Sequence, residues 1–242
     1  MESKNLFKEI YKDKSEIKIW KKLENGCYIG TLGYSEKNIP LLMRLLKSFE
    51  EQYNEEIDYE ATKEELMLYQ TSGKLFVYFN QDGIPISMNG CIYNYDNATV
   101  DFKSVDGRPL NSIYFYGLST LKEFRGQGAC RELIHFAISY AKSLGFDYVY
   151  ARTDLVNSNS EWIMAKAGLE VCLENDLIIA EWVPVTKNVG DYRLHMWMPL
   201  SRGIYLESKG NAVFANNDGI RDLVQVPCPS HCVLAKKLNS VI

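Results

Sequence analysis

The chain has 242 residues, of which 46% are hydrophobic and 24% charged, and its formal net charge is −4. This composition is that of an ordinary globular protein with a substantial core, and the negative balance argues against a nucleic-acid binder that depends on phosphate contacts. No apolar run approaches the roughly 18 residues of a membrane span, and the charged start of the chain lacks a signal-peptide core, so we expect a cytoplasmic protein with no membrane partner.

The six cysteines are spread along the chain rather than gathered into a disulfide framework, and we expect them to be reduced. They are Cys27, Cys91, Cys130, Cys172, Cys228 and Cys232. Two of them flank His231, but no second cluster completes a four-ligand zinc site. We therefore interpret that segment as a proline-bounded loop with free thiols and expect no metal.

The first part of the chain predicts an arm, a strand and two helices. Residues 1–25 indicate a short amphipathic helix or arm with Leu6, Phe7, Ile10 and Tyr11 on its apolar face, and 27–33 indicate a strand. Ser35 or Asn38 is expected to cap a helix with an apolar stripe, and Thr62 with Glu65 to form the capping box of the next. The acidic stretch 50–60 between them is interpreted as a turn-like loop, either merely solvated or a rim that attracts a cationic acceptor.

The rest of the chain alternates mostly between strands and turns. Expected strands cover 74–80, 84–93, 98–105, 111–121, 146–152, 169–185 and 192–200. Expected helices follow Gly128 and Asn157, the first with a stripe at Leu133, Ala137, Tyr140, Ala141 and Leu144 and an end at Gly145. Residues 201–242 carry no pattern to which we assign a function.

The segment between the 111–121 strand and the next helix is the most informative part of the sequence. Arg125-Gly126-Gln127-Gly128-Ala129 stands where a helix begins, so free backbone N–H groups and the positive end of the helix dipole should meet there. Two glycines let the backbone approach a ligand closely, and Arg125 adds a cation. Such a turn binds phosphate, and the rival Gly-rich phosphate motifs do not fit.

This segment resembles the acyl-CoA signature of the GCN5-related N-acetyltransferase (GNAT) superfamily, with Cys130 in the last small position. Asn157, followed by a short helix and Gly168, resembles the family's second element in the right order. The resemblance implies an α/β (α+β) fold with a mixed, mostly antiparallel central sheet splayed between two parallel strands and flanked by helices. It also implies three parts: an arm at 1–25, the acyltransferase domain at 26–200, and a C-terminal extension at 201–242.

The resemblance further implies acetyl-CoA as co-substrate and assigns residues to it. Backbone groups at a bulge over Leu118, Ser119 and Thr120 would pair with the pantetheine arm, and Asn157 would bond it from the other side. The turn would hold the pyrophosphate through the following residues: Arg125, Gly126, Gln127, Gly128, Ala129 and Cys130.

The catalytic residues are harder to assign. The family often has Glu or His on the strand before the glycine turn, and the matching positions here are Tyr114 and Tyr116. With an ordinary pKa of about 10, tyrosine suits water positioning better than proton removal, and both rings could simply pack. Glu161 and His195 are remote alternatives. Met164 stands where the family frequently has a proton-donating Tyr, and a thioether cannot donate a proton.

These features favour an N-acetyltransferase that moves an acetyl group from acetyl-CoA to an amine of a small molecule or peptide by direct attack. A covalent intermediate is disfavoured because Cys130 is expected to pack into its helix. Two alternatives stay open: a catalytically weak acyl-CoA-binding module or sensor, and a protein acetyltransferase. A homodimer is compatible with either.

Overall fold

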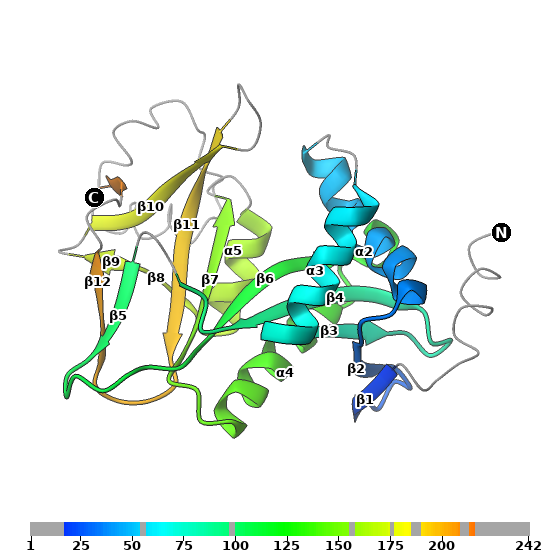
Figure 1. Cartoon of the computed structure of the whole chain (residues 1–242), viewed down its shortest axis with the longest axis horizontal. Coiled ribbons are helices and arrows are strands. Elements are labelled where there is room, and N and C mark those ends of the chain that lie inside the picture. The colour runs from blue at the N-terminus through cyan, green and yellow to red at the C-terminus, as the bar shows by residue number, and fades with distance from the viewer. Residues whose placement is uncertain are drawn as a thin grey trace. The chain divides into compact units, whose positions relative to one another are not determined.

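The computed structural model describes residues 17–53, 57–96, 100–154, 158–174, 177–184, 190–208 and 213–215 (Figure 1). The chain divides into two compact units, each of which takes two stretches of the sequence. Unit 1 comprises Met1–Tyr93 and Phe115–Ala137, and unit 2 comprises Asn94–Tyr114 and Ile138–Ile242.

Unit 1 is a sheet of neighbouring strands in the order β1-β2-β3-β4-β6 with helices along it. The strands are β1 (Ile17–Lys22), β2 (Tyr28–Leu32), β3 (Gly73–Phe79), β4 (Pro85–Tyr93) and the part of β6 (Ser112–Thr120) from Phe115 onward. The helical elements are η2 (Glu36–Asn38), α2 (Ile39–Tyr53), α3 (Tyr59–Ser72), η3 (Lys122–Phe124) and the first part of α4 (Ala129–Ser143). The pairs β1–β2, β2–β3 and β3–β4 are antiparallel.

The two helices before β3 are where predicted, but their ends differ from the prediction. Ser35 caps the short η2 turn, which leads directly into α2. α2 runs to Tyr53, so the first residues of the acidic stretch are helical rather than turn-like. α3 begins earlier than Thr62, because the carboxylate of Asp58 accepts a hydrogen bond from the N–H of Glu60 at 2.7 Å. Thr62 instead lies inside the helix, where its hydroxyl bonds the Asp58 carbonyl.

The predicted stripe of α4 is confirmed at its centre and wrong at its end. Leu133, Ala137 and Ala141 are fully buried, whereas Leu144 is 55% exposed. The helix stops at Ser143, and Gly145 turns the chain with a φ of 75°. The stripe therefore ends one turn early, as a glycine at this position dictates.

Unit 2 continues from the first residues of β6 in the order β6-β7-β11-β10-β13, with a separate β12–β5 pair. Its elements are β5 (Val100–Ser104), β7 (Tyr148–Asp154), α5 (Ser158–Lys166), β8 (Glu170–Val171), β9 (Leu173–Glu174), β10 (Leu177–Pro184), β11 (Gly190–Pro199), β12 (Ile204–Ser208) and β13 (Val213–Ala215). The strand expected over 169–185 is three strands, because β9 and β10 pair antiparallel with Leu177 opposite Glu174.

The fold is a mixed α/β one with a mostly antiparallel sheet, one parallel pair and flanking helices. The predicted fold class is confirmed at this level. The limits of the three predicted parts stay a prediction, although the described pieces of both ends pair with strands of the middle part. β1 pairs with β2, and β12 pairs with β5. The apolar face expected of the arm, formed by Leu6, Phe7, Ile10 and Tyr11, lies outside the described residues, as do Cys228 and Cys232.

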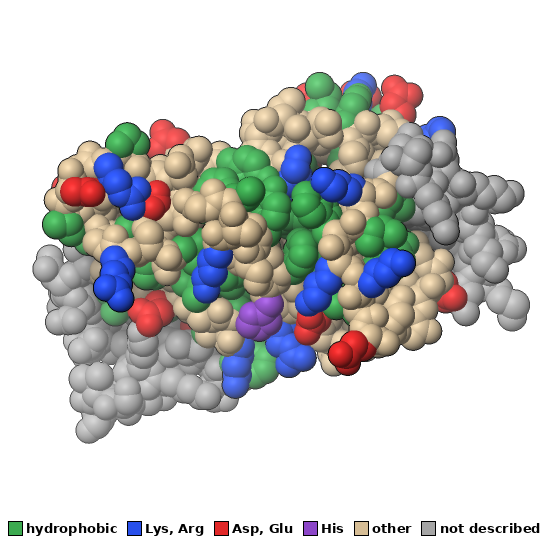
Figure 2. Space-filling view, turned by 90° about the horizontal axis from the view of Figure 1, so that it is seen from below, with side chains coloured by type: hydrophobic (Ala, Val, Ile, Leu, Met, Phe, Trp, Pro, Cys, Tyr) green, Lys and Arg blue, Asp and Glu red, His purple; other side chains and the backbone are tan. Residues whose placement is uncertain are grey.

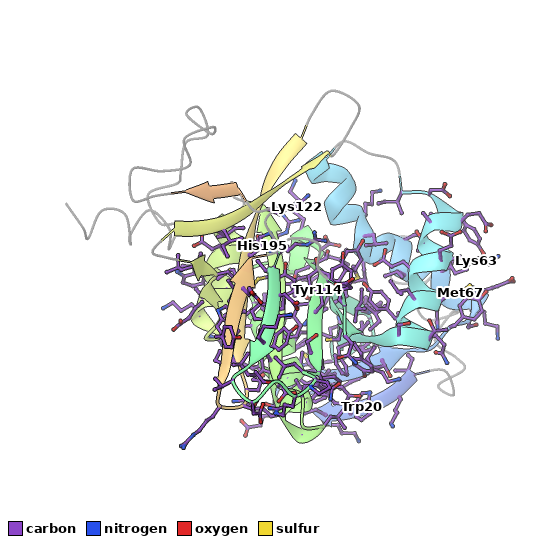
Figure 3. All side chains as sticks on the ribbon, turned by 60° about the vertical axis from the view of Figure 1, so that its left-hand side comes forward. Trp20, Lys63, Met67, Tyr114, Lys122 and His195 are labelled. Carbon is purple, nitrogen blue, oxygen red and sulfur yellow. The ribbon has the colours of Figure 1, made fainter. Side chains whose placement is uncertain are left out.

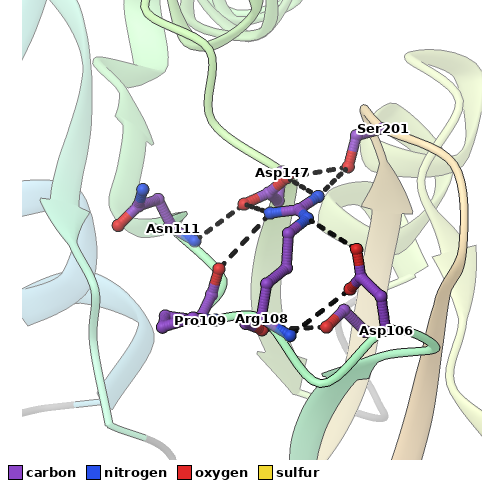
Figure 4. Close-up of polar contacts among 7 residues, drawn as sticks. Asp106, Arg108, Pro109, Asn111, Asp147 and Ser201 are labelled. Carbon is purple, nitrogen blue, oxygen red and sulfur yellow. Dashed lines mark hydrogen bonds and ion pairs between the residues drawn. The ribbon is translucent and has the colours of Figure 1, made fainter.

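A buried carboxylate joins three segments of unit 2 (Figure 4). Asp147, only 5% exposed, accepts two hydrogen bonds from the Arg108 guanidinium, at 2.6 and 3.0 Å. It also accepts from the Ser201 hydroxyl at 2.8 Å and from the backbone N–H of Asn111 at 3.0 Å. The Arg108 bonds, followed by those from Asn111 and Ser201, hold the pKa of Asp147 well below its usual range.

Asp147→Asn is expected to lower the free energy of unfolding by about 2–3 kcal/mol, because the amide has one acceptor oxygen in place of two and its NH2 group would face the donors that now bond the buried carboxylate. The folded-state pKa of Asp147 is depressed, so its contribution is present above the ordinary aspartate pKa of about 3.9 and is lost as the pH falls through the lower folded value. Denaturant unfolding below about pH 4 should therefore show an acid-dependent loss in the wild type that is reduced in the variant.

Asp101→Asn is the matched control, since Asp101 is 39% exposed and pairs with the half-exposed Lys103. Its cost should stay below about 1 kcal/mol. Equal costs for the two substitutions would contradict the role given to Asp147.

Candidate functional site

The turn between β6 and α4 has the backbone geometry that its glycines predicted. Gly126 and Gly128 have φ values of 78° and 86°, a conformation that residues with a side chain rarely adopt. A Cβ at Gly126 would meet nothing within 4 Å. The turn is thus open on the side of the missing Cβ. Its glycines allow the positive φ angles and leave room for a ligand to come close to the backbone.

Positive charge and backbone donors gather at this turn. Lys122, Arg125 and Arg131 are all exposed, and Arg125 is steadied by a bond from its Nε to the Thr120 carbonyl at 3.2 Å. A backbone bond from Glu132 N–H to the Gly128 carbonyl, at 3.0 Å, opens the helix, so the N–H groups of the preceding turn have no helical acceptor. Figure 1 draws α4 in its lower part, and Figure 2 views the molecule from below. Basic side chains are visible on that face. The arrangement suits a phosphate or pyrophosphate.

The strand leading into the turn is irregular at one residue. Gly117 has a φ of 62° in the middle of β6, which breaks the alternation of a regular strand. The bulge predicted over Leu118 to Thr120 thus has its unusual backbone angle one residue earlier. Ser119 is tied into unit 1, because its hydroxyl bonds the Leu45 carbonyl at 2.8 Å and its carbonyl accepts from the Ser87 hydroxyl at 2.7 Å.

The first turn of α4 contains Ala129, which is buried, and Cys130, which is partly buried. Ala129 is 3% exposed and packs in the core. Burial raises the pKa of the Cys130 thiol to about 12, against a smaller lowering effect of a hydrogen bond with the Thr120 side chain. Cys130 is therefore a neutral thiol at physiological pH, which makes it a poor nucleophile. The remaining turn residue, Gln127, is exposed.

The two candidate tyrosines of β6 differ sharply in environment. Tyr114 (Figure 3) is 4% exposed and stacks on Tyr95 and Tyr150 at 4.4 and 5.3 Å between ring centroids. Its hydroxyl accepts a bond from Arg152 Nε at 3.1 Å, and burial raises its pKa. Tyr116 is 40% exposed. Of the two side chains, that of Tyr116 is the more exposed.

Sequence reasoning missed Glu65 of α3 as a functional candidate. Its Oε1 accepts a hydrogen bond from the Tyr69 hydroxyl at 2.8 Å and would lie 3.5 Å from a Cβ at Gly117. Partial burial raises the pKa of Glu65, against a smaller lowering by the Tyr69 bond. The available signal was the spacing of Glu65 and Tyr69, which are four residues apart on an expected helix and so share a face.

The other candidates belong to unit 2 or lie outside the described residues. Asn157 is among the latter. Met164 and Glu161 on α5 are 3% and 1% exposed, and His195 (Figure 3) is fully buried with its Nδ1 2.6 Å from the Tyr150 hydroxyl. Full burial of Glu161 and His195 leaves both without the solvent access that Tyr116 has.

Two kinds of feature are absent from the described residues. No helix among them is long and apolar enough to cross a membrane, and no group of three or more His, Cys, Asp or Glu side chains in that part of the chain could hold a metal ion. The predicted absence of a metal cofactor stays a prediction.

Comparison with known proteins identifies the family. The acetyltransferase (GNAT) family model matches residues 39–168, more than half of the 242-residue chain. The matched range includes the turn at Arg125 to Cys130 and Gly168. Among curated proteins, none matches this chain.

Solved structures share the fold at low sequence identity. The NatC complex bound to Gag peptide and CoA matches with a TM-score of 0.54, 15% identity, 72% of this chain and 99% of that chain. A ribosomal-protein-alanine N-acetyltransferase from Brucella melitensis matches with a TM-score of 0.53 and 15% identity, over 71% of this chain and 98% of that chain. The yncA protein from Salmonella typhimurium was solved with its cofactor acetyl-CoA. It matches with a TM-score of 0.53 and 13% identity, over 74% of this chain and 96% of that chain. Together with the match to the family model, this likeness of fold places the chain in the acetyltransferase (GNAT) family.

Proposed function

We propose that this protein is an acetyl-CoA-dependent N-acetyltransferase that acetylates an amine of a small molecule or peptide. The turn at Arg125 to Cys130 is the observation that carries the proposal. Its two glycines at positive φ, its exposed cations and its helix N-terminus form a pyrophosphate site within a segment that matches the family. Two of the structural neighbours were solved with CoA or acetyl-CoA, which supports the same co-substrate here.

In this proposal the rest of the coenzyme extends from the turn along β6. The backbone of Leu118, Ser119 and Thr120 would pair with the pantetheine arm, and Asn157 would bond it as the family resemblance implies. Ser119 already uses its hydroxyl and carbonyl inside unit 1, and the Thr120 carbonyl accepts from Arg125 Nε, so Leu118 is the better placed partner. Tyr114 and Tyr116 stay candidates for the catalytic centre, with the exposed Tyr116 favoured.

Direct attack by the amine on the thioester fits the environment of Cys130. A covalent acetyl-cysteine route needs a thiolate, and a thiol whose pKa lies at about 12 supplies almost none at neutral pH. One N–C bond therefore forms as the C–S bond breaks, and CoA leaves as a thiolate that needs little help because its thiol is acidic. The cytoplasmic location and a homodimer stay predictions.

The alternative of an acyl-CoA-binding module without turnover is separated by coenzyme release. The wild-type chain is mixed with acetyl-CoA and, in turn, putrescine, spermidine, an Nα-blocked lysine amide and an alanyl tripeptide with a free amino terminus. We expect at least one amine to release CoA and to gain one acetyl group for each CoA released, measured with a thiol reagent and by mass spectrometry. Tight coenzyme binding with no amine-dependent release would favour the binding module.

A further inference from the structure

A hydrogen-bonded carboxylate lies beside the irregular residue of β6, entirely within unit 1. Glu65 of α3 is half-buried, and its Oε1 is held by the Tyr69 hydroxyl at 2.8 Å. The same oxygen would lie 3.5 Å from a Cβ built on Gly117, and the Tyr69 hydroxyl 3.3 Å from it. Gly117 immediately precedes Leu118 to Thr120, the segment that the proposed function assigns to the coenzyme arm.

Glycines on two strands provide the room for this pair. A side chain at Gly90 of β4 would overlap the Tyr69 ring, including its hydroxyl. A side chain at Gly117 would come close to both Tyr69 and Glu65 and would also have to adopt a φ of 62°. The Tyr69 ring is 2% exposed, so its hydroxyl is fixed in place and holds the carboxylate over the bare backbone of β6. A glycine is thus present at each of the two places where a side chain would crowd the pair.

The electrostatic surroundings of Glu65 are those of a base rather than of an ion-pair partner. Partial burial raises its pKa toward neutrality. The titratable groups whose charges act on the adjoining Tyr69 are Glu65 itself, Tyr116 of β6 and Cys91 of β4, all of them acids. None of the ion pairs among the described residues involves Glu65. A carboxylate in such a place binds an ammonium group and can take a proton from it.

We propose that Glu65 is the general base of the acetyl transfer, positioned by Tyr69. It first attracts the acceptor as an ammonium ion and removes one proton, which moves to Oε1 or Oε2. The neutral nitrogen then attacks the acetyl carbonyl carbon, the N–C bond forms, the C–S bond breaks, and the second nitrogen proton leaves to solvent as the CoA thiolate departs. This inference rests on the proposed function and supplies the base that the sequence did not reveal.

Glu65→Gln is the first test, because the amide keeps the shape and can still accept the Tyr69 bond but takes no proton. With acetyl-CoA and either spermidine or the alanyl tripeptide, kcat/KM should fall a hundredfold or more. Acetyl-CoA affinity by calorimetry should stay within threefold. Glu64→Gln is the matched control, since Glu64 is its exposed neighbour on α3, and it should keep wild-type turnover.

Tyr69→Phe is the second test, with a readout that a purely structural role would not change. The ring still fills the space over Gly90, but the bond that lowers the pKa of Glu65 is gone. The base must be deprotonated to act, so the acidic limb of the pH–rate profile should move to higher pH in Tyr69→Phe and vanish in Glu65→Gln.

The outcomes separate this inference from the function on which it rests. Absence of turnover in the wild type with every amine would overturn both. With an active wild type, Glu65→Gln activity within threefold of Glu64→Gln, or an unmoved acidic limb in Tyr69→Phe, would overturn the role of Glu65 alone. A fall in acetyl-CoA affinity as large as the fall in rate would overturn it as well.

Discussion

Tyr116→Phe is expected to slow turnover about a hundredfold, because it removes one hydroxyl near the proposed reacting centre and leaves the ring in place. Tyr116 is 40% exposed, adjoins Gly117, and its charge acts on Tyr69, which holds Glu65. A hydroxyl there can order the water that takes the second nitrogen proton, after Glu65 has removed the first. Steady-state CoA release with the best amine, at several pH values, measures the effect, and acetyl-CoA affinity should be unchanged.

Met164→Ala provides the contrast. Met164 is 3% exposed on α5 and its thioether cannot donate a proton to the leaving thiolate. Its removal should therefore lower kcat/KM for acetyl-CoA by less than about tenfold, within about 1.4 kcal/mol of transition-state stabilisation. A large loss in Met164→Ala together with a small one in Tyr116→Phe would mean that the chemistry belongs to α5 rather than to β6.

Gly128→Glu is expected to weaken acetyl-CoA binding at least tenfold, or about 1.4 kcal/mol. The new carboxylate repels the pyrophosphate, and the φ of 86° at this position strains any residue with a side chain. A Cβ there would also lie 3.6 Å from the Arg131 guanidinium, so the carboxylate could pair with a cation that the phosphate needs. Calorimetric titration with acetyl-CoA measures the loss.

Gly145→Glu is the matched control, because it adds the same charge and a similar strain at the other end of α4. Gly145 has a φ of 75° and open space around its missing Cβ. Its affinity for acetyl-CoA should stay within twofold of wild type, while thermal unfolding should show similar destabilisation in both variants. Unchanged affinity in a folded Gly128→Glu protein would remove the turn from the coenzyme site.

The turn could be predicted from the sequence because its requirements are local. Gly126 and Gly128 adopt positive φ, and the helix after them begins where the pattern placed it. Such geometry depends on a few neighbouring residues, and a glycine reports it directly. The same holds for Gly145 at the end of α4.

The errors occurred where two local signals competed. Thr62 and Glu65 have capping-box spacing, but Asp58 offers a carboxylate to the Glu60 N–H and starts the helix first. The apolar run from Leu169 contains the polar sequence Glu174-Asn175-Asp176, whose residue types favour a turn, and three strands replace one.

Local pattern was thus enough for the backbone geometry of the glycine turn, and the resemblance carried by that turn and by Asn157 and Gly168 was enough for the family and the fold class. The surroundings of Glu65 could not be predicted from the sequence. Glu65 and Tyr69 come from a helix, while Gly90 and Gly117 come from two later strands. Burial and hydrogen bonding set the pKa of a carboxylate, and both arise only when segments distant in the chain pack together. The sequence therefore assigned Glu65 to a helix cap, and only the packed structure indicates that it is a base.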